Sequence, residues 1–331
     1  MVRVPACSLI LAACFALVHA ADTDSSTGEK RVIAGFRPSV ALAVVGLILF
    51  GLVTVVHWIH FFRNGLKRYM LTLTIGMTCM TVGFVMRIIY AGNDTSLGLY
   101  ILQTMFILLS PCAFLANDYV LLCRLANAFG PDVADQALLI RPSRIVKIFV
   151  WSDVITFWLQ ACGGGMSAAS GSIASLGHDV ALVGLVLQLV SFGLFTALLV
   201  VFGFRIRRLS LDMRTMITPL HFGRYRVWSK DLVSDWRLLW VVLALTCIGI
   251  LIRSTFRIVE YAQGYSGYLA THEGYFYALD ALPLLLSMAT FIYVWPTRVI
   301  DGAARFDGGD AFASPYGGGE VKLGEWQPRE E

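Results

Sequence analysis

Apolar segments separated by short polar ones run along most of the chain. Between residues 40 and 295, seven of these segments approach the ~20 residues that a helix needs to cross a bilayer. The pattern predicts an all-α polytopic membrane protein, a bundle of seven transmembrane helices, although a length of 331 residues alone would suggest two soluble domains. The expected spans are 40–62, 69–91, 97–122, 145–166, 180–204, 238–261 and 275–295.

Composition supports a membrane protein, because 57% of the residues are hydrophobic and only 15% are charged, against about 25% in soluble chains. The first 20 residues have the features of a secretory signal peptide, with Arg3 before an apolar stretch at 8–18 and a cleavage site after Ala20. The alternative is a short first anchor that is retained. The expected parts are a signal peptide at 1–20, an extracellular segment at 21–39, the membrane domain at 40–298 and a disordered cytoplasmic tail at 299–331.

Lysine and arginine are distributed unevenly between the two ends of the expected spans. Nineteen of them lie in the segments that follow spans one, three and five and in the tail, whereas the other side carries only Lys30, Arg31 and Arg37. Because cytoplasmic loops are enriched in Lys and Arg, we expect the N-terminus outside and the C-terminus in the cytoplasm. The signal peptide implies the same orientation and delivery through the secretory pathway to the plasma membrane.

Polar side chains inside the spans recur at helical spacing, so the polar residues of one span share a face. In span four, Asp153, Thr156, Gln160 and Gly164 follow this rule. Such residues are costly in hydrocarbon, and we expect them to face the interior of the bundle. The corresponding residues elsewhere are Gln103, Ser110, Asn117 and Asp118 in span three, Gln188 and Ser191 in span five, Arg253, Arg257 and Glu260 in span six, and Glu273, Tyr277, Asp280 and Ser287 in span seven.

The charged residues inside the spans divide by depth. Asp118 and Asp153 fall in the half expected to be cytoplasmic. Two interpretations are open for the outer charges: they only hold the helices together, or they also bind a polar headgroup or relay protons. The outer half contains three arginines and three carboxylates, which can neutralise one another around a polar interior: Arg87, Arg253, Arg257, Glu260, Glu273 and Asp280.

What the sequence lacks disfavours several functions. It has no GxxxxGK[ST] loop for ATP-driven transport and no GxSxG nucleophile motif, and no lysine between 231 and 321 that could form a retinal Schiff base. His57 and His60 cannot complete a zinc site by themselves, so we expect neither a metal nor a cofactor. No basic aromatic patch suggests binding to nucleic acid. Three glycines at 163–165 would permit either close packing or local unwinding of span four.

Four stretches of the spans carry motifs in a fixed order. They are QTMFILLSPCAFLANDYVLLCRL in span three, WSDVITFWLQACGGG in span four, GLVLQLVSFGLF at 184–195, and RSTFRIVEYAQG followed by HEGYFYALDALPLLL in spans six and seven. Together they resemble the fungal RTA-like proteins, the lipid-translocating exporter family, over about residues 41–298. One departure is Phe256, at a position where tyrosine is common in that family.

The resemblance implies a seven-span membrane protein, N-terminus outside, without a recognised cofactor. It also implies a link to the release of sphingoid long-chain bases and to resistance against toxic amphiphiles. The positions that match the family's motifs are Asp118, Asp153, Gln160, Gln188, Arg253, Arg257, Glu260, Glu273, Tyr277 and Asp280.

Two functional hypotheses follow. The first is an exporter or translocase for membrane lipids, either sphingoid bases or phospholipids, in which Asp118, Asp153 or Asp280 pairs with a cationic head. The charged residues of span six would then form an outer gate or contact a phosphate-bearing head. The alternative is a receptor-like sensor that acts indirectly on lipid asymmetry, with the long loop 205–237 binding a cytoplasmic partner. An enzyme acting on lipids is least favoured, because no nucleophile–base pair or metal set is visible.

Overall fold

The computed structural model describes residues 39–92, 96–129, 131–167, 172–212, 236–264 and 267–301. The expected signal peptide, nearly all of the expected extracellular segment and the tail beyond residue 301 lie outside these ranges. The fold described below therefore concerns the expected membrane domain alone.

All seven expected spans are present as helices that are long and apolar enough to cross a membrane, in the ranges that the structure describes. The first six are α2 (Val40–Arg63), α3 (Leu71–Gly92), α4 (Leu97–Asn127), α6 (Pro142–Ser167), α7 (Ser172–Asp212) and α8 (Trp236–Ala262). The seventh is composite, formed by α10 (Glu273–Tyr275), a π-helical segment (Phe276–Ala281) and α11 (Leu282–Tyr293). Shorter elements are a 3₁₀ turn (Arg68–Met70), α5 (Pro131–Ala137) and α9 (Tyr268–Thr271).

Several helices extend beyond the expected spans. Much of the expected loop at 167–179 belongs to α7, and so do residues 205–212 of the expected loop 205–237, whose central part at 213–235 lies outside the described residues. Hydropathy marks only the apolar part of a helix, whereas backbone hydrogen bonding continues into the polar flanks. Residues 296–301 are also helical, with Val299 and Ile300 buried, so the ordered chain continues past the expected end at 298.

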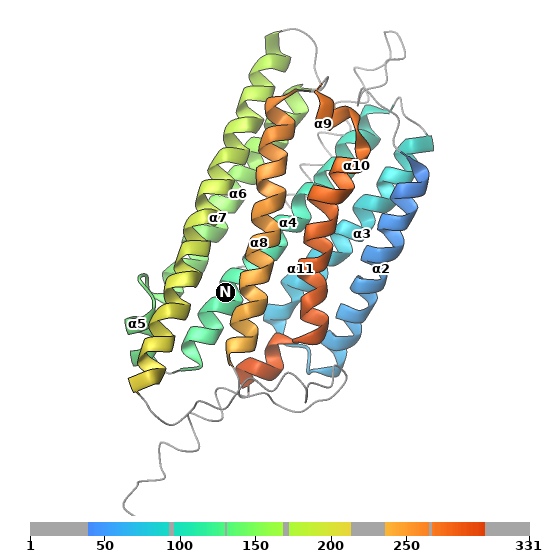
Figure 1. The fold of residues 1–331 in the computed structure, drawn as a ribbon. Coiled ribbons are helices and arrows are strands. Elements are labelled where there is room, and N and C mark those ends of the chain that lie inside the picture. The colour runs from blue at the N-terminus through green and yellow to red at the C-terminus, as the bar shows by residue number, and fades with distance from the viewer. Residues whose placement is uncertain are drawn as a thin grey trace, which may run out of the picture.

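The helices form a closed ring in the order α2, α3, α4, α6, α7, α8 and α11, which packs back on α2. Figure 1 shows them side by side, with α9 at one end of the bundle and α5 at the other. The end with α9, where α2 begins, is called here the Ser39 end, and the opposite end is called the Arg63 end. Helix α4 also contacts α7 and α8 across the ring, so its side chains reach the centre of the bundle.

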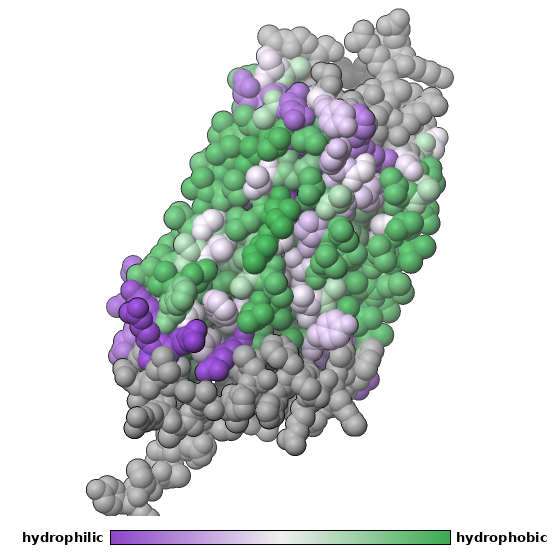
Figure 2. All heavy atoms as spheres, in the orientation of Figure 1, coloured by the Kyte–Doolittle hydropathy of each residue, from purple (hydrophilic) through white to green (hydrophobic). Residues whose placement is uncertain are grey.

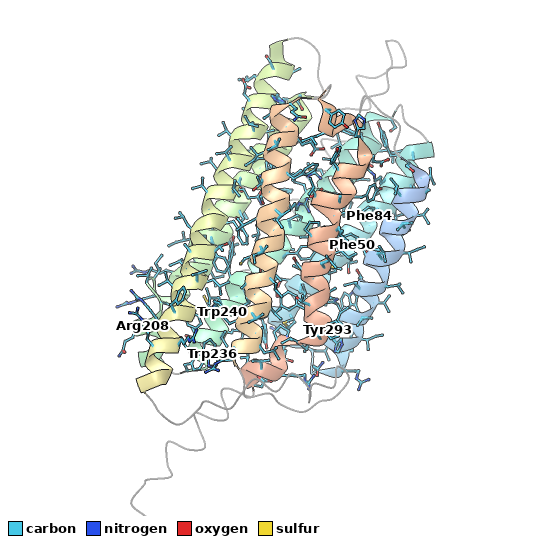
Figure 3. All side chains as sticks on the ribbon, in the orientation of Figure 1. Phe50, Phe84, Arg208, Trp236, Trp240 and Tyr293 are labelled. Atoms are coloured by element: carbon cyan, nitrogen blue, oxygen red, sulfur yellow. The ribbon has the colours of Figure 1, made fainter. Side chains whose placement is uncertain are left out.

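The outer surface of the bundle is apolar, as a lipid environment requires. Hydrophobic residues cover the middle of the face in Figure 2, and hydrophilic ones gather toward its two ends. Helix α2 exposes large apolar side chains along its length, including Val45, Ile48, Leu52 and Val55. Inside, aromatic rings bind neighbouring helices: Phe50 of α2 stacks on Phe84 of α3 with ring centroids 5.2 Å apart (Figure 3). The chain is an integral membrane protein; its orientation stays a prediction.

Close packing explains the first glycine of the run at 163–165. Helix α6 remains helical through Ser167, so the run does not unwind it. Gly163 faces α7, where a Cβ atom would lie 2.7 Å from the carbonyl oxygen of Gly177 and would also meet the backbone of Ala181. At Gly165 a Cβ atom would meet nothing within 4 Å. Of the two roles expected for the glycine run, close packing and local unwinding, the structure shows close packing of α6 on α7 at Gly163.

This contact predicts different effects for two equivalent substitutions. Gly163→Ala should destabilise the protein by about 1–3 kcal/mol, because the backbone of α7 must shift to admit the methyl group. Gly165→Ala is the matched control and should leave the melting temperature of the purified protein unchanged. Equal melting temperatures for the two variants would contradict the packing assigned to Gly163.

Candidate functional site

A buried aspartate at the start of the seventh span organises the charges of the Ser39 half. Asp280 is fully buried, and its two carboxylate oxygens each face an arginine of α8. The Nε atom of Arg253 lies 2.7 Å from Oδ1, and Nη2 of Arg257 donates to Oδ2 at 2.5 Å. Because a lone buried charge is strongly unfavourable, these two ion pairs account for arginines inside an apolar helix.

Three further residues complete the network. Glu260 accepts from Nη1 of Arg257 at 3.1 Å, one turn along α8. Arg87 of α3 pairs with Glu273 at 2.6 Å, and the other oxygen of Glu273 accepts from the backbone N–H of Ser39 at 2.7 Å. The network thus contains three arginines and three carboxylates, and the distances between them confirm the sequence-based prediction that these charges neutralise one another.

Two interrupted helices meet at Arg253. Pro111 lies inside α4, and a proline cannot donate to the carbonyl four residues earlier, which here belongs to Ile107. Nη2 of Arg253 donates to this carbonyl oxygen at 3.3 Å. Asp280, its other partner, lies in the π-helical segment that precedes Pro283. Arg253 therefore links the irregular points of α4 and of the seventh span.

Sequence reasoning missed the π-helical segment and the role of Phe276. In this segment the N–H of Leu282 bonds to the carbonyl of Tyr277, five residues back, a geometry that is rare and often found at functional sites. The segment turns the Phe276 ring toward two arginines, with Cζ of Arg87 at 4.6 Å and Cζ of Arg257 at 5.3 Å from its centroid. The nearby Pro283 was the available signal, since proline disturbs the hydrogen-bond ladder before it.

The network borders a cavity of about 160 Å³ at the Ser39 end. Its charged walls are Arg87, Arg257, Glu260 and Glu273. An engineered apolar cavity of about 150 Å³ holds a benzene molecule, so this one is large enough for a small headgroup. Other polar or aromatic lining residues are Tyr90, Tyr100, Gln103, Thr104, Gln160, His178, Tyr261 and Phe276.

Two amide oxygens of the cavity wall have no hydrogen-bond partner, Oε1 of Gln103 and Oε1 of Gln160. The amide of Gln160 instead donates to Oε1 of Gln188 on α7 at 2.8 Å. Gln188 in turn approaches the sulfur of Cys112 on α4 at 3.9 Å. A line of polar groups therefore leads from the cavity wall into the centre of the bundle.

Two further aspartates lie closer to the Arg63 end. Asp118 of α4 is fully buried and accepts from the hydroxyl of Thr246 on α8 at 2.8 Å. Asp153 of α6 is 3% exposed, and neither of its carboxylate oxygens has a hydrogen-bond partner. In the part of the chain that the structure describes, neither aspartate forms an ion pair within 4.0 Å.

The predicted site residues thus separate into groups. Arg253 and Asp280 are outside the wall of the cavity and join the helices beside it, while Tyr277 stacks toward Phe84 of α3 at 6.3 Å. Asp118, Asp153 and Gln188 do not line the cavity either. The structure brings four of the ten to the cavity wall: Gln160, Arg257, Glu260 and Glu273.

The two histidines of α2 pack against the tryptophan ring of Trp295. His60 stacks on Trp295 with centroids 5.2 Å apart, and His57 lies edge-on to the same ring at 6.0 Å. Within the described ranges, no group of three or more His, Cys, Asp or Glu residues is placed to hold a metal ion.

A seven-helix membrane bundle with a neutralised charge network and a polar cavity at one end defines a class: polytopic membrane proteins with an internal polar site. Comparison with known proteins is more specific. The family model described as "RTA1 like protein" matches residues 73–303, and the chain belongs to this RTA1-like family.

Three relatives from Saccharomyces cerevisiae illustrate the range of the family. Protein RTA1 is 35% identical over 240 residues, covering 69% of this chain and 69% of its own. Protoporphyrin uptake protein 1 is 27% identical over 302 residues, covering 81% and 93%. The sphingoid long-chain base transporter RSB1 is 23% identical over 301 residues, covering 84% and 77%. No solved structure matches the chain.

The network predicts that its members differ in their contribution to stability. Asp280→Asn should destabilise the protein by about 3–5 kcal/mol, because it leaves two buried arginines without their shared carboxylate. Glu260→Gln, on the half-buried side of the same network, should cost much less, since Arg257 keeps Asp280 as partner. Thermal unfolding of the purified variants measures this order, and a larger loss in Glu260→Gln would contradict the central place of Asp280.

Proposed function

We propose that this chain is a transporter that moves long-chain amphiphiles with a hydrogen-bond-donating cationic head, such as sphingoid bases, between the leaflets of the plasma membrane. The observation that carries the proposal is the polar cavity inside an otherwise apolar bundle, with unpartnered acceptors in its wall. The similarity to RSB1, a sphingoid long-chain base transporter, supports the substrate class. Transport, rather than catalysis, is the role assigned.

The wall of the cavity suits an ammonium group that carries neighbouring hydroxyls. Such a head has only donors to offer at its nitrogen, and the free amide oxygens of Gln103 and Gln160 are acceptors. The rings of Tyr90, Tyr100 and Tyr261 add faces that attract a cation. The arginines of the wall do not repel it strongly, since each is neutralised by a carboxylate.

The size of the cavity decides where the rest of the molecule lies. About 160 Å³ accommodates a headgroup and excludes a long alkyl chain. The chain would therefore remain among lipid tails while the head is enclosed. This arrangement lowers the main barrier to flipping, which is the cost of taking a charged head through hydrocarbon.

The contacts of the three aspartates considered for the ammonium support one of them as its partner. Asp280 already has an arginine at each carboxylate oxygen, and Asp118 is held by Thr246. Asp153 has no ion-pair partner among the described residues, and the polar contacts that begin at Gln160 in the cavity wall lead through Gln188 to Cys112, which interacts electrostatically with it. We therefore assign the deeper binding position to Asp153, with Asp280 as a structural group.

The proposal predicts that Gln160 is needed for movement but not for folding. Gln160→Leu keeps the volume, removes the acceptor in the cavity wall and should lower the transport rate about tenfold, equivalent to ~1.4 kcal/mol on the barrier. The assay follows a fluorescent sphingoid base between leaflets of liposomes that contain only this protein. Cys162→Ser, an exposed position on the same helix, is the matched control and should transport at the unchanged rate.

The outcomes distinguish the proposal from a sensor. Movement above that of empty liposomes, reduced in Gln160→Leu, supports transport by this chain. No movement from folded protein overturns the proposed function and favours the sensor. Full-rate movement in Gln160→Leu would retain a transporter but contradict the role of the cavity.

A further inference from the structure

Two buried aspartates of the bundle, Asp118 and Asp153, have no cationic partner among the described residues. Arg87, Arg253, Arg257, Glu273 and Asp280 each have an oppositely charged partner. Asp118 accepts a hydrogen bond from Thr246, whereas the carboxylate oxygens of Asp153 accept none of standard geometry and have the Tyr119 hydroxyl as polar neighbour, although only 3% of the Asp153 surface is exposed. An ionised carboxylate left in this state costs several kcal/mol, so it must be compensated by a bound cation or a proton.

The groups around Asp153 show what it can bind. Helix α4 contributes the hydroxyl of Tyr119, which interacts with the carboxylate as a donor, and the thiol of Cys112. Helix α7, which packs along α6, contributes the neutral amide of Gln188 through its contact with Cys112. Asp118 is the nearest further carboxylate on α4, beside Tyr119, and Arg253 of α8 approaches Cys112 but is bound to Asp280.

This environment favours a proton over a metal ion. A hard cation requires about six oxygen ligands, and no group of three or more His, Cys, Asp or Glu residues lies together in the described ranges. A proton requires one carboxylate oxygen and an exchange route. The contacts from Gln160 to Gln188 and from Gln188 to Cys112 lead from the cavity wall toward this carboxylate, which interacts electrostatically with Cys112, and they are the route that we assign to the proton.

We propose that Asp153 is a proton-exchange site that couples transport to a proton gradient, an inference that rests on the proposed function. In the resting protein Asp153 carries a proton as a neutral carboxylic acid. When an ammonium head arrives, the O–H bond breaks, the proton leaves to water along the polar line, and the carboxylate pairs with the ammonium. One positive charge replaces another, with no change of oxidation state. Release of the head reverses the step and takes up a proton.

The exchange can be measured by binding alone, without transport. The probe is hexadecyltrimethylammonium, whose charge is fixed, so any proton that appears must come from the protein. Purified protein in weakly buffered detergent is titrated with the probe while a pH dye reports protons and a separate assay reports binding. The wild type should release protons in proportion to probe bound, Asp153→Asn should bind more weakly and release none, and Cys162→Ser should behave as the wild type.

Two results would overturn the proton-exchange site while leaving the proposed function intact. The first is that the wild type binds the probe without releasing protons. The second is that Asp153→Asn releases as many protons as the wild type. If Asp153→Asn does not fold, Tyr119→Phe is used in its place. It should move the release to higher pH, because the phenol no longer faces the carboxylate, and an unmoved release overturns the proposal.

A second readout separates failure of this inference from failure of the proposed function. Because the probe has no N–H donor, the proposed function fails only if a sphingoid base also does not bind, and the proton site is then judged by stability. A proton held in the folded state is lost on unfolding, so the wild-type melting temperature should fall as pH rises from about 5 to about 8, and the slope should be shallower in Asp153→Asn. Equal slopes, or a melting temperature that depends on sodium rather than on pH, overturn the proton site.

Discussion

The fold depends on the requirement that charges buried in an apolar bundle neutralise one another. Asp280 meets this requirement for both Arg253 and Arg257, and all three are held at an interface where Gly249 lets α8 approach α11 closely. Arg253 also satisfies the carbonyl of Ile107 that Pro111 leaves free in α4. One residue of α8 thus connects two helices whose backbone ladders are interrupted, at the depth where the polar cavity ends.

Neutralisation has a consequence for the cavity beside the network. Paired arginines and carboxylates give the cavity a wall that is strongly polar but has no net charge. A cation that enters the cavity is therefore not repelled by an excess of positive charge. The free acceptors Gln103 and Gln160 then provide selectivity for a donor-rich head. Asp153 differs from the charges of the network because it has no ion-pair partner among the described residues, and it differs from Asp118 because no threonine hydroxyl holds it. In the proposed function this difference makes it the group that exchanges one cation for another.

The number of spans and the pairing of the outer charges could both be predicted from the sequence. Both follow from the free-energy cost of placing polar groups in hydrocarbon. Helical spacing placed Asp153 and Gln160 on one buried face correctly. It could not give the π-helical segment, which breaks that spacing and aims Phe276 at two arginines. Nor could it show that Asp280 has an arginine at each carboxylate oxygen whereas Asp153 has no ion-pair partner among the described residues, since partners on other helices depend on how α4, α6 and α8 pack.

The central claim is that the cavity at the Ser39 end receives the head of an amphiphile. Photocrosslinking with a long-chain amine that carries a diazirine beside its nitrogen tests it most directly, with the labelled residues identified by mass spectrometry. The account predicts labels in the wall of the cavity, within residues 100–108 of α4 and 257–261 of α8, and competition by unlabelled sphingoid base. Labels confined to the lipid-facing side of α2, unaffected by competitor, would contradict it.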